Sequence, residues 1–161
     1  MSLHDLWPTR HQLPHFLVLG TQKGGTTSLQ KLLEQHPGVY LPPRKEVHYF
    51  SLHADESPSW YSSHYRNARW RQKRGDITPF YLFHPQAPER IHKLLPKVLL
   101  IALLRDPVER TLSQYFHAKR HGFESLDLIE ALAAEPQRLA TGEAYSFQKQ
   151  SYLARSRYLE Q

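Results

Sequence analysis

A short glycine-containing segment near the start of the chain has the residue types of an oxyanion-binding turn. It follows an apolar run that ends at Gly20 and precedes leucines spaced as one face of a helix. The segment consists of Lys23, Gly24, Gly25, Thr26, Thr27 and Ser28. In a turn between a strand and a helix, backbone N–H groups and the positive end of the helix dipole point at one small volume. The sequence therefore predicts a site for a phosphate or sulfate group, with a purely structural glycine turn as the alternative.

This turn differs from the phosphate loop of nucleoside triphosphatases, G-x-x-x-x-G-K-[ST]. Gly20 and Gly25 have the required spacing and Thr27 occupies the hydroxyl position. Thr26, however, stands where the lysine belongs, and the lysine is at position 23 instead. The change argues against a P-loop nucleotide kinase or nucleoside triphosphate hydrolysis.

The sequence also lacks an obvious metal site. The apolar run from Val98 to Leu104 ends in Arg105 rather than in a magnesium-binding acid. His117 and His121 have i, i+4 spacing, but no glutamate stands beside His117, which favours a solvated helix face. We expect chemistry without a metal. Sulfuryl transfer suits such a site, because the sulfuryl group carries less negative charge than a phosphoryl group and amides and a lysine can stabilise it.

Three separated segments resemble the sulfotransferases that use 3′-phosphoadenosine 5′-phosphosulfate (PAPS), particularly the branch related to heparan sulfate sulfotransferases and their bacterial relatives. Residues 21–29, TQKGGTTSL, are similar to that family's 5′-phosphosulfate loop. Residues 44–50, RKEVHYF, resemble its Lys-Glu-x-His/Gln-aromatic-Phe segment, and residues 104–115 resemble its 3′-phosphate segment, R-[DN]-P-x-x-R-x-x-S-x-[YF]. Residues 75–82 are more loosely similar to a segment written G-E-x-[ST]-P-x-Y.

The resemblance implies how the donor PAPS and the product 3′-phosphoadenosine 5′-phosphate (PAP) are bound. Lys23 would contact the bridging oxygen and the sulfate, while the loop would hold the 5′-phosphate through the amides of residues 24–27 and the hydroxyls of Thr26 and Thr27. Arg105 and Ser113 would bind the 3′-phosphate, the arginine by a charge-assisted contact. An ordinary ion pair of Arg105 with Asp106 or Glu109 is the structural alternative.

The resemblance also implies a general base. Glu46 would take a proton from an acceptor hydroxyl or amine as it attacks sulfur. His48, two residues on, would share a side with Glu46 in an extended segment and would orient or assist it. The alternative is that Arg44, Lys45 and Glu46 form a solvated charge cluster after two prolines.

The hydrophobic pattern predicts an α/β fold. Continuous apolar runs, at 16–19 and 98–104, are typical of strands buried in a parallel sheet. Shorter strands are expected at 39–41 and 75–79, and helices at 29–36, 89–95, after Pro107, and at 126–134 and 147–159, with Pro136 as a breaker. Together these predict a three-layer, P-loop-like fold with a central parallel sheet flanked by helices. We expect an irregular segment at 1–15 followed by one domain at 16–161.

The charge of the chain is concentrated in one stretch. The 161 residues carry a formal net charge of +6 at pH 7, and the stretch from Arg66 to Arg74 contributes five positive charges and no acid. Trp70 lies inside it. The stretch lies between the expected base and Gly75, which predicts that it attracts an anionic acceptor. The alternative is a solvated stretch with Trp70 anchored in the core.

Composition excludes several function classes. The chain has no cysteine, which removes disulfides, thiolate zinc sites and cysteine nucleophiles and fits a reducing compartment. The longest apolar run covers seven residues, far below the roughly 20 of a membrane-spanning helix. The first 15 residues lack the pattern of a secretory signal, so a cytoplasmic location is expected.

The expected activity is transfer of a sulfuryl group from PAPS to a hydroxyl or amine of a small-molecule or glycan acceptor, with no nucleic-acid partner. The resemblance stops before the family's last PAPS-binding loop, so a shortened chain is expected. Missing C-terminal helices would leave apolar faces uncovered, which predicts a homo-oligomer or marginal stability. A non-catalytic, nucleotide-binding remnant is the alternative function.

Overall fold

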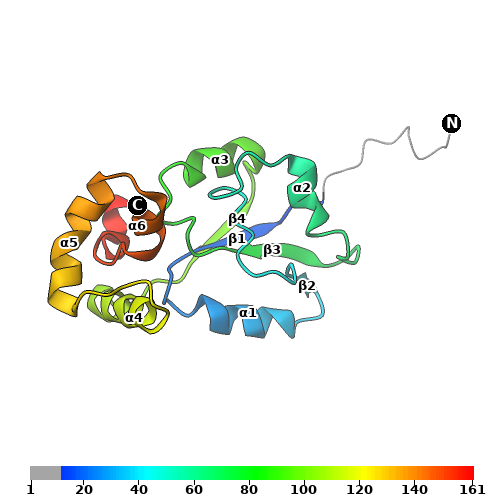
Figure 1. The fold of residues 1–161 in the computed structure, drawn as a ribbon. Coiled ribbons are helices and arrows are strands. Elements are labelled where there is room, and N and C mark those ends of the chain that lie inside the picture. The colour runs from blue at the N-terminus through cyan, green and yellow to red at the C-terminus, as the bar shows by residue number, and fades with distance from the viewer. Residues whose placement is uncertain (1–11) are drawn as a thin grey trace.

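The structure is a computed structural model that describes residues 12–161. Within that range the strands are β1 (Phe16–Gly20), β2 (Val39–Tyr40), β3 (Lys73–Ile77) and β4 (Leu99–Ala102). They form a parallel sheet in the order β2-β3-β1-β4 (Figure 1). Most of the irregular segment predicted at 1–15 lies outside the described residues, and residues 12–15 form no helix or strand.

Helices cover both faces of the sheet and one end of it. They are α1 (Thr26–Glu34), α2 (Pro58–Ser63), α3 (Ala87–Leu94), α4 (Pro107–Arg120), α5 (Leu128–Ala140) and α6 (Ala144–Lys149). In Figure 1, α1 lies on one face, α2 and α3 lie on the other, and α4 to α6 gather beyond the ends of the strands. This arrangement confirms the predicted three-layer α/β fold. No helix in residues 12–161 has the length and apolar character needed to cross a membrane.

The continuous apolar run of β1 is explained by burial on both of its faces. Leu17 is fully buried in a cluster of mainly aromatic side chains that includes Tyr49, Phe50 and Tyr61. Its neighbour Val18 is equally buried on the opposite face, in a cluster to which leucines of α1 contribute. Since successive side chains of a strand point to opposite faces, only a strand between two helical layers needs apolar residues throughout.

The prediction that the second apolar run forms a buried strand is wrong. β4 lies at the edge of the sheet, pairs with β1, and has exposed side chains along its whole length. Leu99 and Leu100 are 68% and 56% exposed. An unbroken apolar run cannot by itself distinguish a central strand from an edge strand. The exposed leucines form an uncovered apolar surface at this edge of the sheet.

The C-terminal helices also differ from their predicted bounds. Pro136 lies inside α5 rather than ending a helix, and α5 begins at a capping box formed by Asp127 and Glu130. The helix predicted at 147–159 is instead α6 followed by two short 3₁₀ turns, Ala154–Ser156 and Tyr158–Glu160. The buried Glu135 carboxylate accepts the backbone N–H groups of residues 153 and 154 at 2.7 and 2.8 Å, so a tertiary contact takes the place of a further helical turn.

Candidate active site

The turn between β1 and α1 has the geometry of an anion site. Gly25 adopts φ 96° at the N-terminal boundary of α1, a left-handed conformation that suits glycine. The backbone N–H groups of Thr26, Thr27 and Ser28 lie in the first turn of α1, where no helical carbonyl is available to accept them. Thr26 is buried and Thr27 is exposed. The turn therefore offers unpaired donors at the positive end of a helix dipole.

Gly24 differs from its expected role as an amide donor. Its N–H donates to the carbonyl of Thr21 at 2.9 Å and is already engaged. A Cβ at this position would lie 2.6 Å from the backbone oxygen of Leu103. Gly24 thus allows the loop to pack closely on the chain that follows β4, and the donors begin beyond it.

Arg105 reaches the same turn from the carboxyl end of β4. Its Nη1 donates to the backbone oxygen of Lys23 at 3.3 Å, and its Nη2 forms an ion pair with Glu109 at 3.2 Å. The structural alternative, an ion pair at the helix start, is therefore present together with the contact to the loop. Ser113 lies two turns into α4 and is half-buried, and its hydroxyl has no hydrogen-bond partner within residues 12–161.

Lys45 connects the turn to the segment that carries the predicted base. Its Nζ donates to Thr27 Oγ1 at 2.6 Å and lies 3.9 Å from a carboxylate oxygen of Glu46. Lys45 and Glu46 are both partly buried, whereas Arg44 is exposed. The three residues do not form a purely solvated charge cluster, because Lys45 and Glu46 are only partly exposed and contact Thr27 and His48.

Glu46 and His48 are in contact, but not through an extended backbone. His48 Nε2 lies 3.3 Å from Glu46 Oε2, and His48 Nδ1 lies 3.0 Å from Ser51 Oγ. A neutral ring with its proton on Nε2 donates to the carboxylate and leaves Nδ1 as an acceptor beside Ser51 Oγ, which also donates to the backbone oxygen of His48 at 3.3 Å. Both residues have φ 60°, so the predicted extended segment is wrong. The curled backbone brings the two side chains together.

Three residues other than glycine have positive φ within residues 12–161, and they are Lys23, Glu46 and His48, at 70°, 60° and 60°. Such conformations cost about 1–3 kcal/mol each and persist where the surrounding structure imposes them. They cluster at functional sites for this reason. The same three residues are the ones that the sequence singles out for catalysis.

A buried network that sequence reasoning missed supports the base segment. Asp76 is fully buried, and its carboxylate accepts hydroxyl donors from Thr78, Tyr61 and Tyr81 at 2.7, 2.7 and 2.9 Å. Thr78 Oγ1 in turn accepts the backbone N–H of His48 at 3.4 Å. The loose match of residues 75–82 to a G-E-x-[ST]-P-x-Y segment was the available signal, since it placed an acid and a hydroxyl two residues apart.

Arg155 is a second residue that the sequence did not indicate. It is almost fully buried, its Nη1 donates to Gln22 Oε1 at 2.6 Å, and its guanidinium lies 4.7 Å from the centre of the Phe80 ring and 4.9 Å from that of Phe83. Burial lowers the pKa of Arg155 to about 9. No spacing could have indicated this contact, because 133 residues separate the arginine from Gln22.

Neighbouring charges keep Glu46 ionised and surround Lys23 with other cations. Burial opposes ionisation of Glu46, but the hydrogen bond and charge of His48, with Lys45 and Lys149, outweigh it and hold the pKa of Glu46 below its usual value. Burial, followed by the positive charges of Arg120, Arg105 and Lys45, lowers the pKa of Lys23. This concentration of positive charge fits an anionic ligand.

The basic stretch from Arg66 to Arg74 does not lie beside this site. Lys73 and Arg74 begin β3, and Gly75 is level with Phe16 at the start of β1. The Lys23 turn follows the other end of β1, so the two features lie at opposite ends of the parallel sheet (Figure 1). The stretch therefore does not adjoin the predicted base, contrary to expectation, whereas its attraction of an anionic acceptor stays a prediction. The core-anchored alternative for Trp70 is wrong, because that side chain is exposed.

Comparison with known proteins shows the family to which the chain is similar. The family model described as "Sulfotransferase domain" matches residues 13–158. The chain is 42% identical to "Membrane-associated sulfotransferase kil1" of Dictyostelium discoideum over 106 residues, which are 64% of this chain and 22% of the relative. It is 35% identical to human "Heparan sulfate glucosamine 3-O-sulfotransferase 6" over 108 residues, 67% of this chain and 31% of the relative. The chain thus spans less than a third of the length of these two curated relatives.

A solved structure extends the likeness to the fold. The crystal structure of a sulfotransferase from Alicyclobacillus acidocaldarius superposes with a TM-score of 0.76 at 31% sequence identity. The match covers 91% of this chain and 68% of that one. The similarity therefore extends over most of the fold.

Proposed function

The chain belongs to the sulfotransferase domain family, and we propose that it takes part in transferring a sulfuryl group from PAPS to a hydroxyl or amine of an acceptor. The observation that carries the proposal is a chain of contacts that joins the three motif segments. Arg105 donates to the backbone oxygen of Lys23, and Lys45 bridges from the Lys23 turn to Glu46. The candidate donor loop, the arginine and the candidate base thus lie together at the carboxyl ends of the parallel strands.

The donor set fits an anion with phosphates at two positions. The unpaired amides that begin at the first turn of α1, with Lys23, are suited to the 5′-phosphosulfate end. Arg105 adjoins the same loop and its ion pair with Glu109 is exposed, so a second phosphate can compete for its guanidinium. The hydroxyl of Ser113, which has no partner among the described residues, can bind the same phosphate. PAPS supplies a sulfuryl group attached to a phosphate oxygen, which is the bond that transfer must break.

The chain's own residues provide the proton and charge balance of the transfer. The Glu46 carboxylate accepts the proton of the attacking hydroxyl or amine, and the low pKa of Glu46 keeps it ionised for this task. As the new bond to sulfur forms and the bond from sulfur to the phosphate oxygen breaks, negative charge appears on that oxygen. The Lys23 ammonium, held at the loop by an unusual backbone conformation, offsets this charge.

A carbohydrate is the acceptor class we propose. Several relatives are named for 3-O-sulfation of glucosamine in heparan sulfate, among them a human protein that is 28% identical over 150 residues, 90% of this chain. The candidate base also lies on a partly exposed segment, which an extended sugar chain can approach.

Two measurements test the proposal. Mass spectrometry should detect PAP and a sulfated product when the chain is incubated with PAPS and heparan-type oligosaccharides. PAP should raise the melting temperature, and ATP with Mg²⁺ should raise it much less. Lys23→Ala should abolish both effects, whereas Lys31→Ala, on the exposed face near the end of α1, should retain them.

The outcomes separate the alternatives. Stabilisation by PAP without transfer to any acceptor would support a non-catalytic nucleotide-binding protein. Equal stabilisation by ATP with Mg²⁺ would contradict the donor assignment itself.

A further inference from the structure

An exposed, hydrogen-bonded turn lies at the end of the sheet opposite the candidate site. Arg69 O accepts the backbone N–H of Gln72 at 3.0 Å, which places Trp70 and Arg71 at the corners of a turn. The Gln72 side chain fixes this turn from both sides. Its Oε1 accepts the N–H of Arg69 at 2.9 Å, and its Nε2 donates to the backbone oxygens of Pro37 and Val39 at 3.2 and 3.0 Å. The turn is therefore held in shape before any partner binds.

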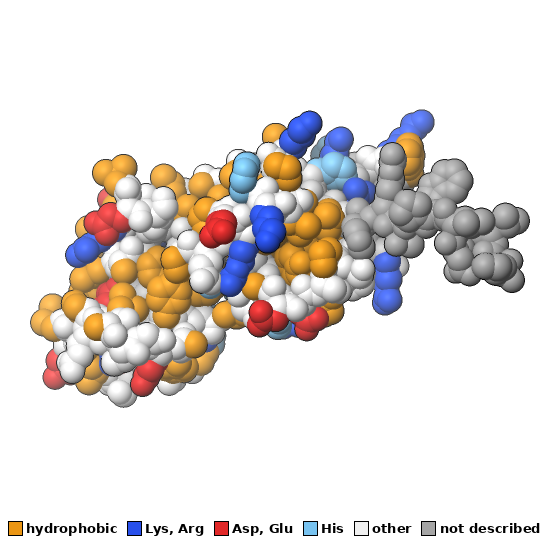
Figure 2. All heavy atoms as spheres, turned by 90° about the horizontal axis from the view of Figure 1, so that it is seen from above, with side chains coloured by type: hydrophobic (Ala, Val, Ile, Leu, Met, Phe, Trp, Pro, Cys, Tyr) orange, Lys and Arg blue, Asp and Glu red, His pale blue; other side chains and the backbone are white. Residues whose placement is uncertain are grey.

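The turn presents an aromatic ring among unpaired cations. Trp70 is 93% exposed. The exposed side chains of Arg66, Arg69, Arg71 and Lys73 surround it in sequence, and none makes an ion pair or side-chain hydrogen bond within residues 12–161. In Figure 2, Lys and Arg side chains project at this end of the molecule, beside the grey residues. Neither core packing nor internal pairing accounts for these side chains.

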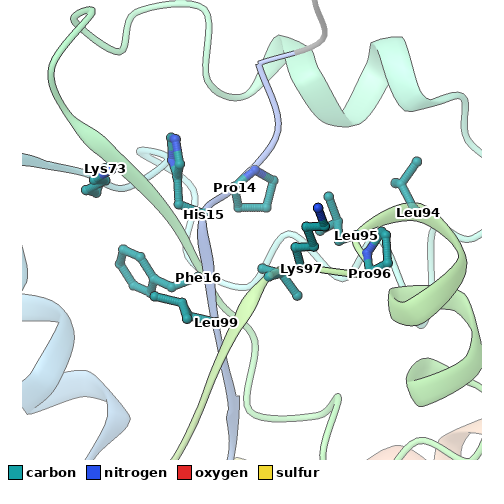
Figure 3. Close-up of a pocket in the computed structure, with 10 residues that line it drawn as sticks. Pro14, His15, Phe16, Lys73, Leu94, Leu95, Pro96, Lys97 and Leu99 are labelled. Atoms are coloured by element: carbon teal, nitrogen blue, oxygen red, sulfur yellow. The ribbon is translucent and has the colours of Figure 1, made fainter.

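An apolar groove opens at the same end of the sheet. It has a volume of about 590 Å³ and is lined mainly by apolar side chains from the starts of β1 and β4 and the end of α3, including Phe16, Leu95 and Leu99. Lys73 and Lys97 are the charged members of its lining, and no acid belongs to it. In the view of Figure 3, Phe16 and Leu99 lie between the two lysines. Lys73 belongs to both the groove and the basic stretch, so the two features adjoin each other.

We propose that this surface, the Trp70 turn together with the groove, docks on an anionic phospholipid membrane. Tryptophan favours the headgroup region of a bilayer, where its ring is apolar and its N–H is hydrated. Arginine and lysine pair with anionic headgroups. The apolar groove can receive the hydrocarbon adjoining those headgroups. A sulfated glycan would pair with the cations but has no apolar part to fill the groove, whereas the hydrocarbon of a lipid can fill it, so a lipid surface fits both features.

The docking surface and the candidate active site do not compete for space. The Lys23 turn lies beyond the carboxyl ends of the parallel strands, and the Trp70 turn lies beyond their amino ends. A membrane bound at one end leaves the other open to solution. The inference is thus independent of the proposed sulfuryl transfer.

Vesicle binding tests the proposal directly. The chain should co-sediment with vesicles of equal parts phosphatidylcholine and phosphatidylserine and should remain in solution with phosphatidylcholine alone. Its tryptophan fluorescence should shift to shorter wavelength on binding, and Trp70→Ala should remove that shift. Arg69→Ala with Arg71→Ala should weaken binding about 25-fold, because each basic residue near such a surface contributes about fivefold.

Matched variants distinguish this surface from general positive charge. Arg120→Ala with Arg157→Ala also removes two positive charges, but from exposed positions near the opposite end of the sheet. This variant should leave vesicle binding unchanged. Leu99→Thr reduces the apolar lining of the groove at an exposed strand position and should weaken binding with an unchanged circular dichroism spectrum. Failure of the unaltered chain to bind anionic vesicles would overturn the proposal. Retention on heparin or on an oligonucleotide without vesicle binding would do so as well, in favour of a polyanion.

Discussion

Glu46 and His48 face each other at 3.3 Å between Oε2 and Nε2, and both have the same unusual φ of 60°. A contact between residues two apart would normally need side chains on one face of an extended strand. Here the backbone curls instead, and Thr78 and Ser51 hold the histidine at its backbone N–H and its Nδ1. The strained conformation therefore serves to join a carboxylate to an imidazole donor.

The first prediction concerns the proton acceptor. Glu46→Gln should lower kcat for sulfuryl transfer by about 10²- to 10⁴-fold, because general base catalysis contributes on that scale. PAP binding, measured by calorimetry, should stay nearly unchanged, since the loop amides and Lys23 remain. Glu89→Gln, an exposed position on α3, serves as the control and should behave as the parent. Equal activity of the two variants would remove Glu46 from the chemistry.

The second prediction follows from the lowered pKa of Glu46. A carboxyl whose pKa is depressed in the fold keeps its charge as pH falls, so the acidic limb of kcat/KM should lie below the ordinary glutamate pKa of about 4.3. His48→Ala removes the hydrogen bond that opposes the effect of burial, and the limb should move to higher pH. The exposed His92→Ala variant should leave the limb in place. A limb that stays put in His48→Ala would mean that another group limits the rate.

The sequence predicted the parts of the site that depend on short-range order. A strand, a glycine turn and a helix in succession define the loop around Lys23, and Arg105 follows a strand that is parallel to β1. Since the carboxyl ends of parallel strands lie at the same end of the sheet, the Lys23 loop and Arg105 had to lie near each other there. Glu46 was identified by resemblance, but its curled backbone was not, because no residue type near it requires a positive φ.

Long-range contacts explain what the sequence did not predict. The apolar run of β4 predicts a buried strand, although the same run also fits a strand at the edge of the sheet. Trp70 lies at an exposed corner because Gln72 bonds to residues 37 and 39, more than 30 positions away. Arg155 meets Gln22 across most of the chain. The composition of a segment does not reveal such partners.

The third prediction concerns the buried support of the base segment. Asp76→Ala should lower the free energy of unfolding by about 3 kcal/mol, because three buried hydroxyls lose their acceptor. Asp76→Asn keeps an oxygen acceptor and should cost less. Urea unfolding measures both, with the exposed Asp55→Ala as the control. If Asp76→Ala were as stable as that control, the network would contribute nothing to the fold.

The fourth prediction tests whether the close packing of Gly24 in the anion loop matters more than the loss of a glycine elsewhere. Gly24→Ala places a Cβ 2.6 Å from the backbone oxygen of Leu103, which cannot rotate away, so the loop must shift. We expect a loss of stability of about 1–3 kcal/mol, as for other overpacked sites, together with weaker PAP binding in titration calorimetry. Gly38→Ala is the control, because its Cβ would meet only the movable ring of His36, at 3.1 Å. Unchanged PAP affinity in Gly24→Ala would show that the loop does not need its close contact with the chain after β4 to bind the donor.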